Sequence, residues 1–430
     1  MAILASLRES FRRRQSRTDT HDKKYELNVV ILLTLGFGLV GLDRWIIAPL
    51  FPAMMKDLSL NYQDLGNLIG ALGLAWGVFA VVAGGLSDRL GRRKVLVPAI
   101  IGFSLLSGLA GIAQSLTMLI VLRALMGVTE GSFCPTSFAA TAEASKPTRR
   151  GFNLGVQQSA FPLFGLALGP IIATQLLRFF EWRWVFIVVA IPGLILGILI
   201  WRVIREPATV GAHAHVARAP LSEIIKHKNV PLSMIGLMCA MSGIFVLSAM
   251  APNYLVDYLK LDLQQMGFVT SAIGFGGFLG QVVLPGASDV VGRKTIGILG
   301  FALGAAFLYA FKQVGANPVL LFVLLFACTF FCFGLLGLIT GPIATEAAPR
   351  GLISSTAGII IGTGEIFGGG IAPSIAGHIA QTYGIQHVLS FALGGLVLGV
   401  LVCSFLRETA PKKAGASADT VAAVPVTEQK

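Results

Sequence analysis

GGLSDRLGRRK, residues 84–94, is the stretch that decides the fold of this 430-residue chain. It lies between two long apolar runs and carries one acidic side chain among four basic ones. The glycine permits a tight turn, and the aspartate can pair with an arginine or lie at a helix N-terminus. A solvated basic loop that only sets topology would explain the charge, but not a second copy of the stretch that keeps its aspartate, glycine and arginine in register. We therefore expect a structural and gating role for Asp88, Arg89, Arg92 and Arg93.

The stretch recurs in the second half of the chain as PGASDVVGRKT, residues 285–295. This copy keeps the aspartate, the glycine and the first arginine in register. An internal repeat of this size predicts two related halves with a site near the membrane midplane between them. We therefore add Asp289 and Arg293 to the predicted gating residues. Glu143 and Glu346 are added as well, because they occupy matching positions in the two halves, each just ahead of a basic loop.

The composition indicates a membrane protein. Hydrophobic residues make up 55% of the chain and charged residues only 13%, whereas soluble domains carry about 25% charged residues. The net charge of +12 gathers in alternate loops, which is the positive-inside pattern of a membrane protein rather than a nucleic-acid surface. The five cysteines and six histidines lack metal-ligand spacing. We therefore expect no metal, no cofactor and no enzymatic activity, because no Ser-His-Asp set or phosphate loop is visible either.

Apolar runs of ~18 residues or more predict transmembrane helices, and we count twelve. An even number with a basic N-terminus places both termini in the cytoplasm. We expect a cytoplasmic tail (1–27), a first six-helix bundle (28–203), a linker (204–229), a second bundle (230–406) and a disordered tail (407–430). The spans are 28–50, 66–86, 95–114, 117–142, 151–177, 183–203, 230–254, 265–287, 295–311, 318–345, 351–380 and 386–406.

Residues 84–93 match G-x-L-[SA]-D-R-x-G-R-[RK], the loop signature of the major facilitator superfamily, which the chain resembles over residues ~28–408. The resemblance implies an all-α membrane protein with two pseudo-symmetric six-helix bundles, a monomeric functional unit and alternating access. It also implies that the charged loop locks the cytoplasmic side. The stretch GLALGP (165–170) is similar to a motif of the superfamily's drug antiporters, although helix packing alone explains it.

Four charges lie well inside two predicted spans: Asp43 and Arg44 in the first, Arg123 and Glu130 in the fourth. Each charge at a helix centre costs about 2.5–3.5 kcal/mol on insertion scales. One interpretation is a pair of structural ion bridges, Asp43–Arg123 and Arg44–Glu130. Buried ion pairs stabilise weakly, and intramembrane carboxylates are candidates for proton transfer. The alternative is a polar cavity in which the carboxylates exchange protons.

The stretches VGLDRWIIAPLFPAM (40–54) and LRALMGVTEGSFCPT (122–136) resemble the anion:cation symporter family. That resemblance implies that Asp43 and Glu130 are protonatable, that Arg44 binds the substrate anion and that Arg123 couples them. The chain departs from the family in its second span, which offers only Trp76 where polar cavity residues are common. The departure favours aromatic or other weakly hydroxylated carboxylates over sugar acids.

Glu365 in the eleventh span is a fifth intramembrane charge, either facing the cavity or joining the two halves. Gln157, Gln158, Ser159 and Gln281 are further polar candidates, of which Gln157 enters the substrate-binding set. We expect a proton-coupled importer of a small organic anion, such as an aromatic or sugar carboxylate, in the inner cell membrane. Its partners would be protons, substrate and lipid. A spinster-like lysolipid carrier and a drug/proton antiporter are the alternatives.

Overall fold

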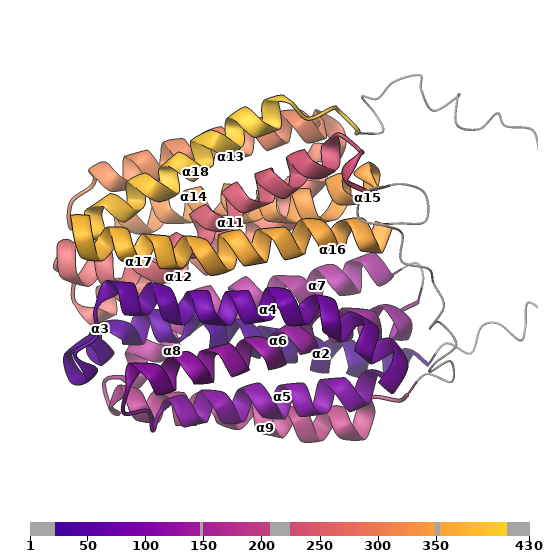
Figure 1. Cartoon of the computed structure of the whole chain (residues 1–430), viewed down its shortest axis with the longest axis horizontal. Helices are drawn as coiled ribbons and strands as arrows, with labels where there is room; N and C mark the ends of the chain where they lie inside the picture. The colour runs from indigo at the N-terminus through magenta and orange to yellow at the C-terminus, as the bar shows by residue number, and fades with distance from the viewer. Residues whose placement is uncertain (1–21, 147–148, 207–223, 349–352, 411–430) are drawn as a thin grey trace, which may run out of the picture.

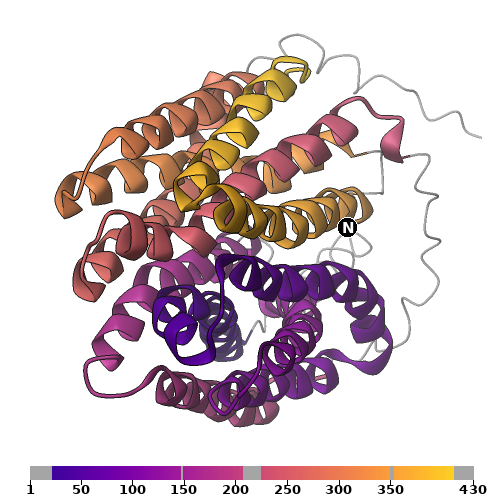
Figure 2. The same cartoon turned by 60° about the vertical axis from the view of Figure 1, so that its left-hand side comes forward.

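The computed structural model describes residues 22–146, 149–206, 224–348 and 353–410 (Figure 1). A few side chains within these ranges, those of Asp88 and Arg89 among them, lie outside the description. We name residues 23–206 the N-half and residues 224–410 the C-half. Figures 1 and 2 agree that the halves lie side by side as two helical bundles. The end of the molecule where the first helix begins and the last one ends is named the terminal end, and the opposite end the far end.

The N-half contains six membrane crossings. Their segments are α2 (Lys23–Trp45) with α3 (Ile47–Leu58), α4 (Tyr62–Leu90), α5 (Arg92–Ala110), α6 (Leu116–Ala144), α7 (Arg150–Pro162) with the π-helix η1 (Leu163–Leu168) and α8 (Gly169–Leu176), and α9 (Trp182–Val203).

The C-half repeats this arrangement. Its segments are α11 (Asn229–Asn253) with the π-helix η2 (Tyr254–Tyr258), α12 (Leu263–Val291), α13 (Arg293–Gln313), α14 (Pro318–Leu338) with the π-helix η3 (Ile339–Ile343) and α15 (Ala344–Ala347), α16 (Ile353–Gly364) with the π-helix η4 (Glu365–Ile371) and α17 (Ala372–Tyr383), and the 3₁₀ turn η5 (Ile385–His387) with α18 (Val388–Ser404).

In the described chain, eleven helical stretches are long and apolar enough to cross a membrane, and α4 lies between the first and second of them as the twelfth crossing. This confirms the predicted all-α fold of twelve transmembrane helices. The first crossing is longer than predicted and breaks at Ile46. The break has a local cause, because Pro49 lacks a backbone N–H and its ring clashes with the carbonyl of Trp45, four residues earlier.

The two copies of the charged stretch form matching tight turns. Gly91 joins α4 to α5 with φ +104°, and Gly292 joins α12 to α13 with φ +113°. Only glycine adopts such angles readily, so the turns confirm the role predicted for these glycines. The helices that lead into them begin with matching caps, because Asn61 and Asp262 each form a capping box at the far end.

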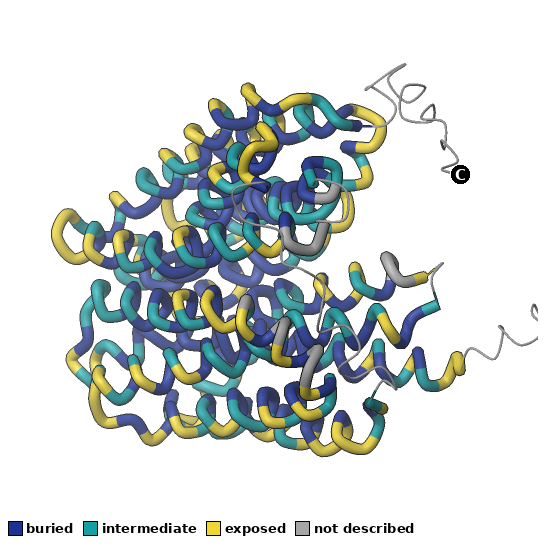
Figure 3. Tube along the Cα trace, turned by 45° about the vertical axis from the view of Figure 1, so that its right-hand side comes forward, coloured by how far each residue is buried: buried dark blue, intermediate teal, exposed yellow. Residues whose placement is uncertain are grey.

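The two halves pack closely at the far end through their π-helices. The segment η1 of the N-half contacts α12, while η4 of the C-half contacts α4. Glycines permit the approach: a Cβ on Gly70 would lie 2.7 Å from the carbonyl oxygen of Gly370, and one on Gly274 would lie 1.9 Å from the backbone nitrogen of Ala167. Figure 3 shows buried positions gathered between the helices, and exposed positions on the outer faces. The far end is therefore closed by backbone packing.

Candidate substrate and proton site

Arg44 lies at the centre of the molecule and joins the two halves. Its side chain is about 1% exposed, and Nη2 donates to Oε2 of Glu365 at 3.1 Å. The guanidinium carbon lies 4.6 Å from the ring centroid of Trp76 and 4.7 Å from that of Phe245. Such ring faces attract a cation. Of the ion pairs described, Arg44–Glu365 is the one that connects residues of different halves, and the others lie within one half.

Arg123 contacts the backbone of the first crossing rather than a carboxylate. Its Nη1 donates to the carbonyl oxygens of Asp43 at 3.0 Å and of Arg44 at 3.1 Å. The carboxylate of Asp43 instead accepts a hydrogen bond of 2.9 Å from Ser107 Oγ on α5. The predicted Asp43–Arg123 ion pair is therefore absent from the described contacts, and the backbone links the two residues.

Glu130 is fully buried on α6, and neither of its carboxylate oxygens has a hydrogen-bond partner in the described chain. The predicted Arg44–Glu130 pair does not form, because Arg44 contacts Glu365 from the other half instead. A carboxylate without a donor in an apolar interior is costly when ionised, which favours a group that carries a proton for part of a cycle.

A cavity of about 120 Å³ adjoins this cluster on its terminal side. Trp76 and Glu365 line it, and Glu365 also joins the two halves, so both of the roles considered for it apply. Of the two neighbouring glutamines on α7, the one that lines it is Gln158. Gln157 is buried and donates to Ser137 Oγ at 2.9 Å, so it does not reach the cavity. The other lining residues are mostly aromatic or aliphatic: Phe37, Cys134, Phe138, Phe161, Leu237, Met241, Phe245, Gln281, Phe333, Leu336, Thr340 and Ile361.

The charged stretches form one network in each half at the terminal end. In the N-half, Arg92 pairs with Glu143 at 2.7 Å and donates to Ser87 Oγ at 2.6 Å. Arg93 is half-buried at the start of α5. The predicted roles of Asp88 and Arg89 concern side chains outside the description. The described contacts of Arg92 therefore remain within the N-half.

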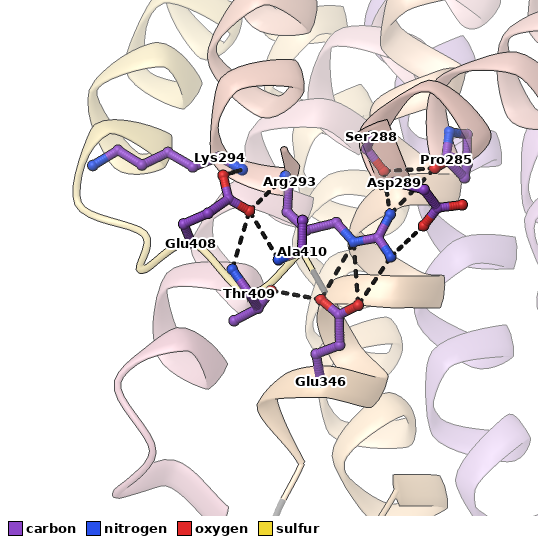
Figure 4. Close-up of polar contacts among 9 residues, drawn as sticks. All are labelled: Pro285, Ser288, Asp289, Arg293, Lys294, Glu346, Glu408, Thr409 and Ala410. Atoms are coloured by element: carbon purple, nitrogen blue, oxygen red, sulfur yellow. Dashed lines mark hydrogen bonds and ion pairs between the residues drawn. The ribbon is translucent and has the colours of Figure 1, made fainter. Parts of the chain in front are cut away.

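In the C-half, Arg293 pairs with Asp289 at 2.6 Å and with Glu346 at 2.9 Å. Figure 4 shows these carboxylates on two sides of the guanidinium, with Ser288 on a third. All of these residues belong to the C-half. The structure thus pairs one arginine of the predicted gating set with one glutamate of that set in each half.

Sequence reasoning missed one member of each network. Glu408 follows α18 and accepts backbone N–H bonds from Arg293 (2.8 Å) and Lys294 (3.2 Å), at the start of α13 (Figure 4). Glu206 follows α9 and accepts from Lys94 N at 3.2 Å in the same way. Burial by itself raises the pKa of Glu408, but backbone donors including Ala410 outweigh it and lower that pKa. The repeated Arg-Glu after the last helix of each half was the available signal.

Comparison with known proteins places this geometry in a family. A sequence model of the Major Facilitator Superfamily matches residues 33–360 and 233–429. The chain is 26% identical over 420 residues to a hexuronate transporter of Bacillus subtilis (strain 168), covering 92% of this chain and 98% of that protein. It is 28% identical over 391 residues to a probable 4-methylmuconolactone transporter of Cupriavidus pinatubonensis (strain JMP 134 / LMG 1197), covering 87% and 89%.

A solved structure shares the fold. It is a bacterial homolog of the human lysosomal transporter Spinster in an inward-facing, unoccupied conformation, with a TM-score of 0.75, 15% identity and coverage of 89% of this chain and 97% of that one. The sequence relatives are transporters rather than enzymes, as we expected for this chain. The chain therefore belongs to the Major Facilitator Superfamily and is a multi-pass integral membrane protein.

Proposed function

We propose that this protein is a proton-coupled symporter that imports a small organic anion by alternating access. The observation that carries the proposal is Arg44, a buried cation whose Nε and Nη1 have no hydrogen-bond partner in the described chain. Arg44 does not line the cavity itself but contacts three residues that do, Trp76, Phe245 and Glu365. Arginine stays charged at physiological pH and binds carboxylates through two parallel hydrogen bonds. A carboxylate could accept from one of these free donors, and a second bond parallel to it would require Nη2, which now donates to Glu365.

The lining of the cavity supports an aromatic or weakly hydroxylated carboxylate. Phe37, Phe138, Phe161 and Phe333 line it together with Trp76. Few polar side chains are available there to bind the hydroxyl groups of a sugar acid. The Bacillus relative is named a hexuronate transporter and the Cupriavidus relative a probable methylmuconolactone transporter. Both names support an oxygen-rich organic substrate, and the aromatic lining favours the less hydroxylated kind.

The proton-coupling proposal rests on Asp43 and Glu130. Both are buried, and Arg123 lies between them through its contacts with the α2 backbone. Protonation of the two carboxylates from outside would leave Arg44 and Arg123 to attract a substrate anion. After reorientation, proton loss to the cytoplasm would restore the competing negative charges and release the substrate. The proton is the coupling ion, and we propose no other cofactor.

We propose that the terminal end faces the cytoplasm of a cell whose inner membrane holds the protein. The basic residues near this end, including Lys23, Lys94, Arg149 and Arg407, support that orientation by the positive-inside rule. We propose a monomer as the functional unit. With the far end closed and the cavity on the terminal side, the structure corresponds to an inward-facing state.

The decisive experiment is uptake by proteoliposomes containing Glu130→Gln. We expect the variant to lose accumulation driven by a pH gradient while it retains counterflow exchange, because exchange requires no net proton movement. Glu181→Gln, the same chemical change at an exposed position, should behave as the unmodified protein. Accumulation by Glu130→Gln along a pH gradient would show that the coupling assignment is wrong.

The alternatives predict different outcomes in the same vesicles. A drug/proton antiporter would move its substrate outward as protons enter, and a cationic drug would be repelled by Arg44. A lysolipid carrier must hold a long acyl chain, for which a cavity of about 120 Å³ gives little room. A melting-temperature screen against a panel of carboxylates at acidic and neutral pH would identify the substrate class, because ligands stabilise the state that they bind.

A further inference from the structure

Arg44 presents a problem for any cycle in which the empty carrier must reorient. Its charge is permanent, and it lies buried near the midplane, where an unpaired charge is expensive. With substrate bound, a carboxylate neutralises it. Without substrate, another anion has to take that place, or the return step carries an uncompensated charge.

The structure holds such an anion in Glu365. This residue begins η4 in the C-half and is about 9% exposed. It takes part in no other ion pair of the described chain. Its Oε2 accepts from Arg44 Nη2 at 3.1 Å, and its side chain lines the cavity. The other nearby carboxylates, Asp43 and Glu130, form no hydrogen bond with Arg44 in the described chain.

We propose that Glu365 is an internal substitute for the substrate: it neutralises Arg44 in the empty carrier, and an incoming carboxylate displaces it. The inference rests on the proposed function and deepens it. Because the pair links the halves, it forms part of their contact at the midplane. Substrate binding replaces the Arg44–Glu365 contact by a contact between Arg44 and the ligand. The charge of Arg44 is therefore compensated in two states: when substrate is bound, and when Arg44 pairs with Glu365.

When substrate displaces Glu365 from Arg44, the carboxylate of Glu365 is left beside the substrate and can influence which substrates bind. Once released, Glu365 remains at the cavity wall among the rings of Trp76 and Phe245. A carboxylate there favours a substrate with a hydrogen-bond donor, such as a hydroxyl group, and repels a second carboxylate. The substrate class is therefore a monocarboxylate with an aromatic or apolar body and a donor group rather than a dicarboxylate.

The test is Glu365→Gln in the full-length protein, with the carboxylate that gives the largest stabilisation of the unmodified carrier as probe. Removing the internal competitor should tighten binding about tenfold to a hundredfold, because one charge-assisted hydrogen bond is no longer in competition. Counterflow exchange should persist, since the carrier is then always loaded. Net uptake should fall at least tenfold, because in the empty return step Arg44 loses the carboxylate that contacts it, and the remaining carboxylates, Asp43 and Glu130, form no hydrogen bond with it in the described chain.

Glu365→Asp separates this mechanism from simple charge repulsion. It keeps the negative charge but shortens the side chain by one methylene, so the contact with Arg44 weakens. Internal substitution predicts tighter binding in this variant too, whereas mere repulsion predicts unchanged binding. Glu365→Asp also serves alone if Glu365→Gln is too unstable to purify. The melting temperatures of both variants without ligand, compared with that of the unmodified protein, show whether a change in binding or uptake is caused by loss of stability.

The outcomes distinguish failure of the inference from failure of the proposed function. If the unmodified protein transports no carboxylate, the proposed function fails. If it transports one, but both variants bind it with unchanged affinity and accumulate it normally, Glu365 is no internal substitute and the inference is overturned.

Discussion

The closed far end predicts that a single methyl group on α12 will bias the carrier toward the state in which the far end is open, which is the outward-facing state in the proposed orientation. Gly274 packs against η1 of the other half. A Cβ there would lie 1.9 Å from the nitrogen of Ala167, 2.3 Å from the carbonyl carbon of Leu166 and 2.4 Å from the carbonyl oxygen of Pro162. All three are backbone atoms, so no side-chain rotation can relieve the clash. In Gly274→Ala the two halves must separate locally.

The clash in Gly274→Ala raises the free energy of only one of the two conformational states, and this determines how far their populations shift. Overpacking of a well-filled interior costs about 1–3 kcal/mol. This cost applies to the state in which α12 touches η1, and it vanishes when the far end opens. Since about 1.4 kcal/mol corresponds to a factor of ten in an equilibrium constant, the population ratio of the two states should shift by about 5- to 150-fold toward the outward-facing state.

A native cysteine provides the assay. Cys134 lines the cavity and is half-buried, while the other four cysteines are buried. In oriented cells, a membrane-impermeant maleimide added outside should label Cys134 faster in Gly274→Ala by about the same 5- to 150-fold factor, as expected for a shift in population. Cys134→Ser should remove the signal. Gly286→Ala, on the same helix with open space at its Cβ, should label as the unmodified protein does.

A second control separates a shift of state from loss of stability. A Cβ on Gly276 would lie 2.4 Å from the carbonyl oxygen of Phe326, which belongs to the same half. Gly276→Ala should lower the melting temperature without speeding the labelling of Cys134. If Gly274→Ala labels no faster than the unmodified protein and transports normally, the far-end contact does not control access and the reasoning is refuted.

Three further predictions follow. Arg44→Lys should weaken carboxylate binding about tenfold or more, measured by melting-temperature shifts, because an ammonium group cannot form the two parallel bonds of a guanidinium. Glu408 has a lowered pKa, so its stabilising effect is complete above its unfolded-state pKa and is lost as the pH falls through its folded-state pKa. The difference in melting temperature between the unmodified protein and Glu408→Gln should therefore shrink on acidification; a constant difference would contradict this. Lastly, the buried midplane charges of the described chain comprise two arginines and three carboxylates, so neutrality needs one bound proton when empty and two with a monoanion. Uptake should then move one proton per monocarboxylate and be insensitive to a potassium-diffusion potential.

Much of the fold could be predicted from the sequence because its signals are local. Long apolar runs mark the crossings, and the tight turns need glycine at the positions now occupied by Gly91 and Gly292. The repeat placed Arg92 and Glu143, and likewise Arg293 and Glu346, in one predicted gating set, although it did not predict that they pair. Each of these contacts stays within one half, where the order of helices restricts the possible neighbours.

The partner of Arg44 could not be predicted in this way. One interpretation of the sequence paired Arg44 with Glu130 of the same half, but in the structure Arg44 bonds to Glu365, 321 positions away in the chain. That contact depends on how the halves are oriented, which no local pattern encodes. The sequence analysis placed Gln157 in the substrate-binding set, whereas Gln158 lines the cavity. Neighbouring residues on a helix differ by about 100° in direction, and no local pattern showed which direction faces inward. Only the packed structure shows which one faces the cavity.

The two kinds of contact between the halves assign different roles to the far end and the midplane. At the far end the halves meet through glycine backbones such as Gly70 and Gly274, and packing of this kind responds to neither substrate nor pH. At the midplane they meet through Arg44 and Glu365, a contact that a carboxylate can replace. A ligand shifts a conformational equilibrium only by its difference in affinity for the two states. The substrate must therefore act through the midplane pair, while the far-end packing sets the resting balance against which it acts.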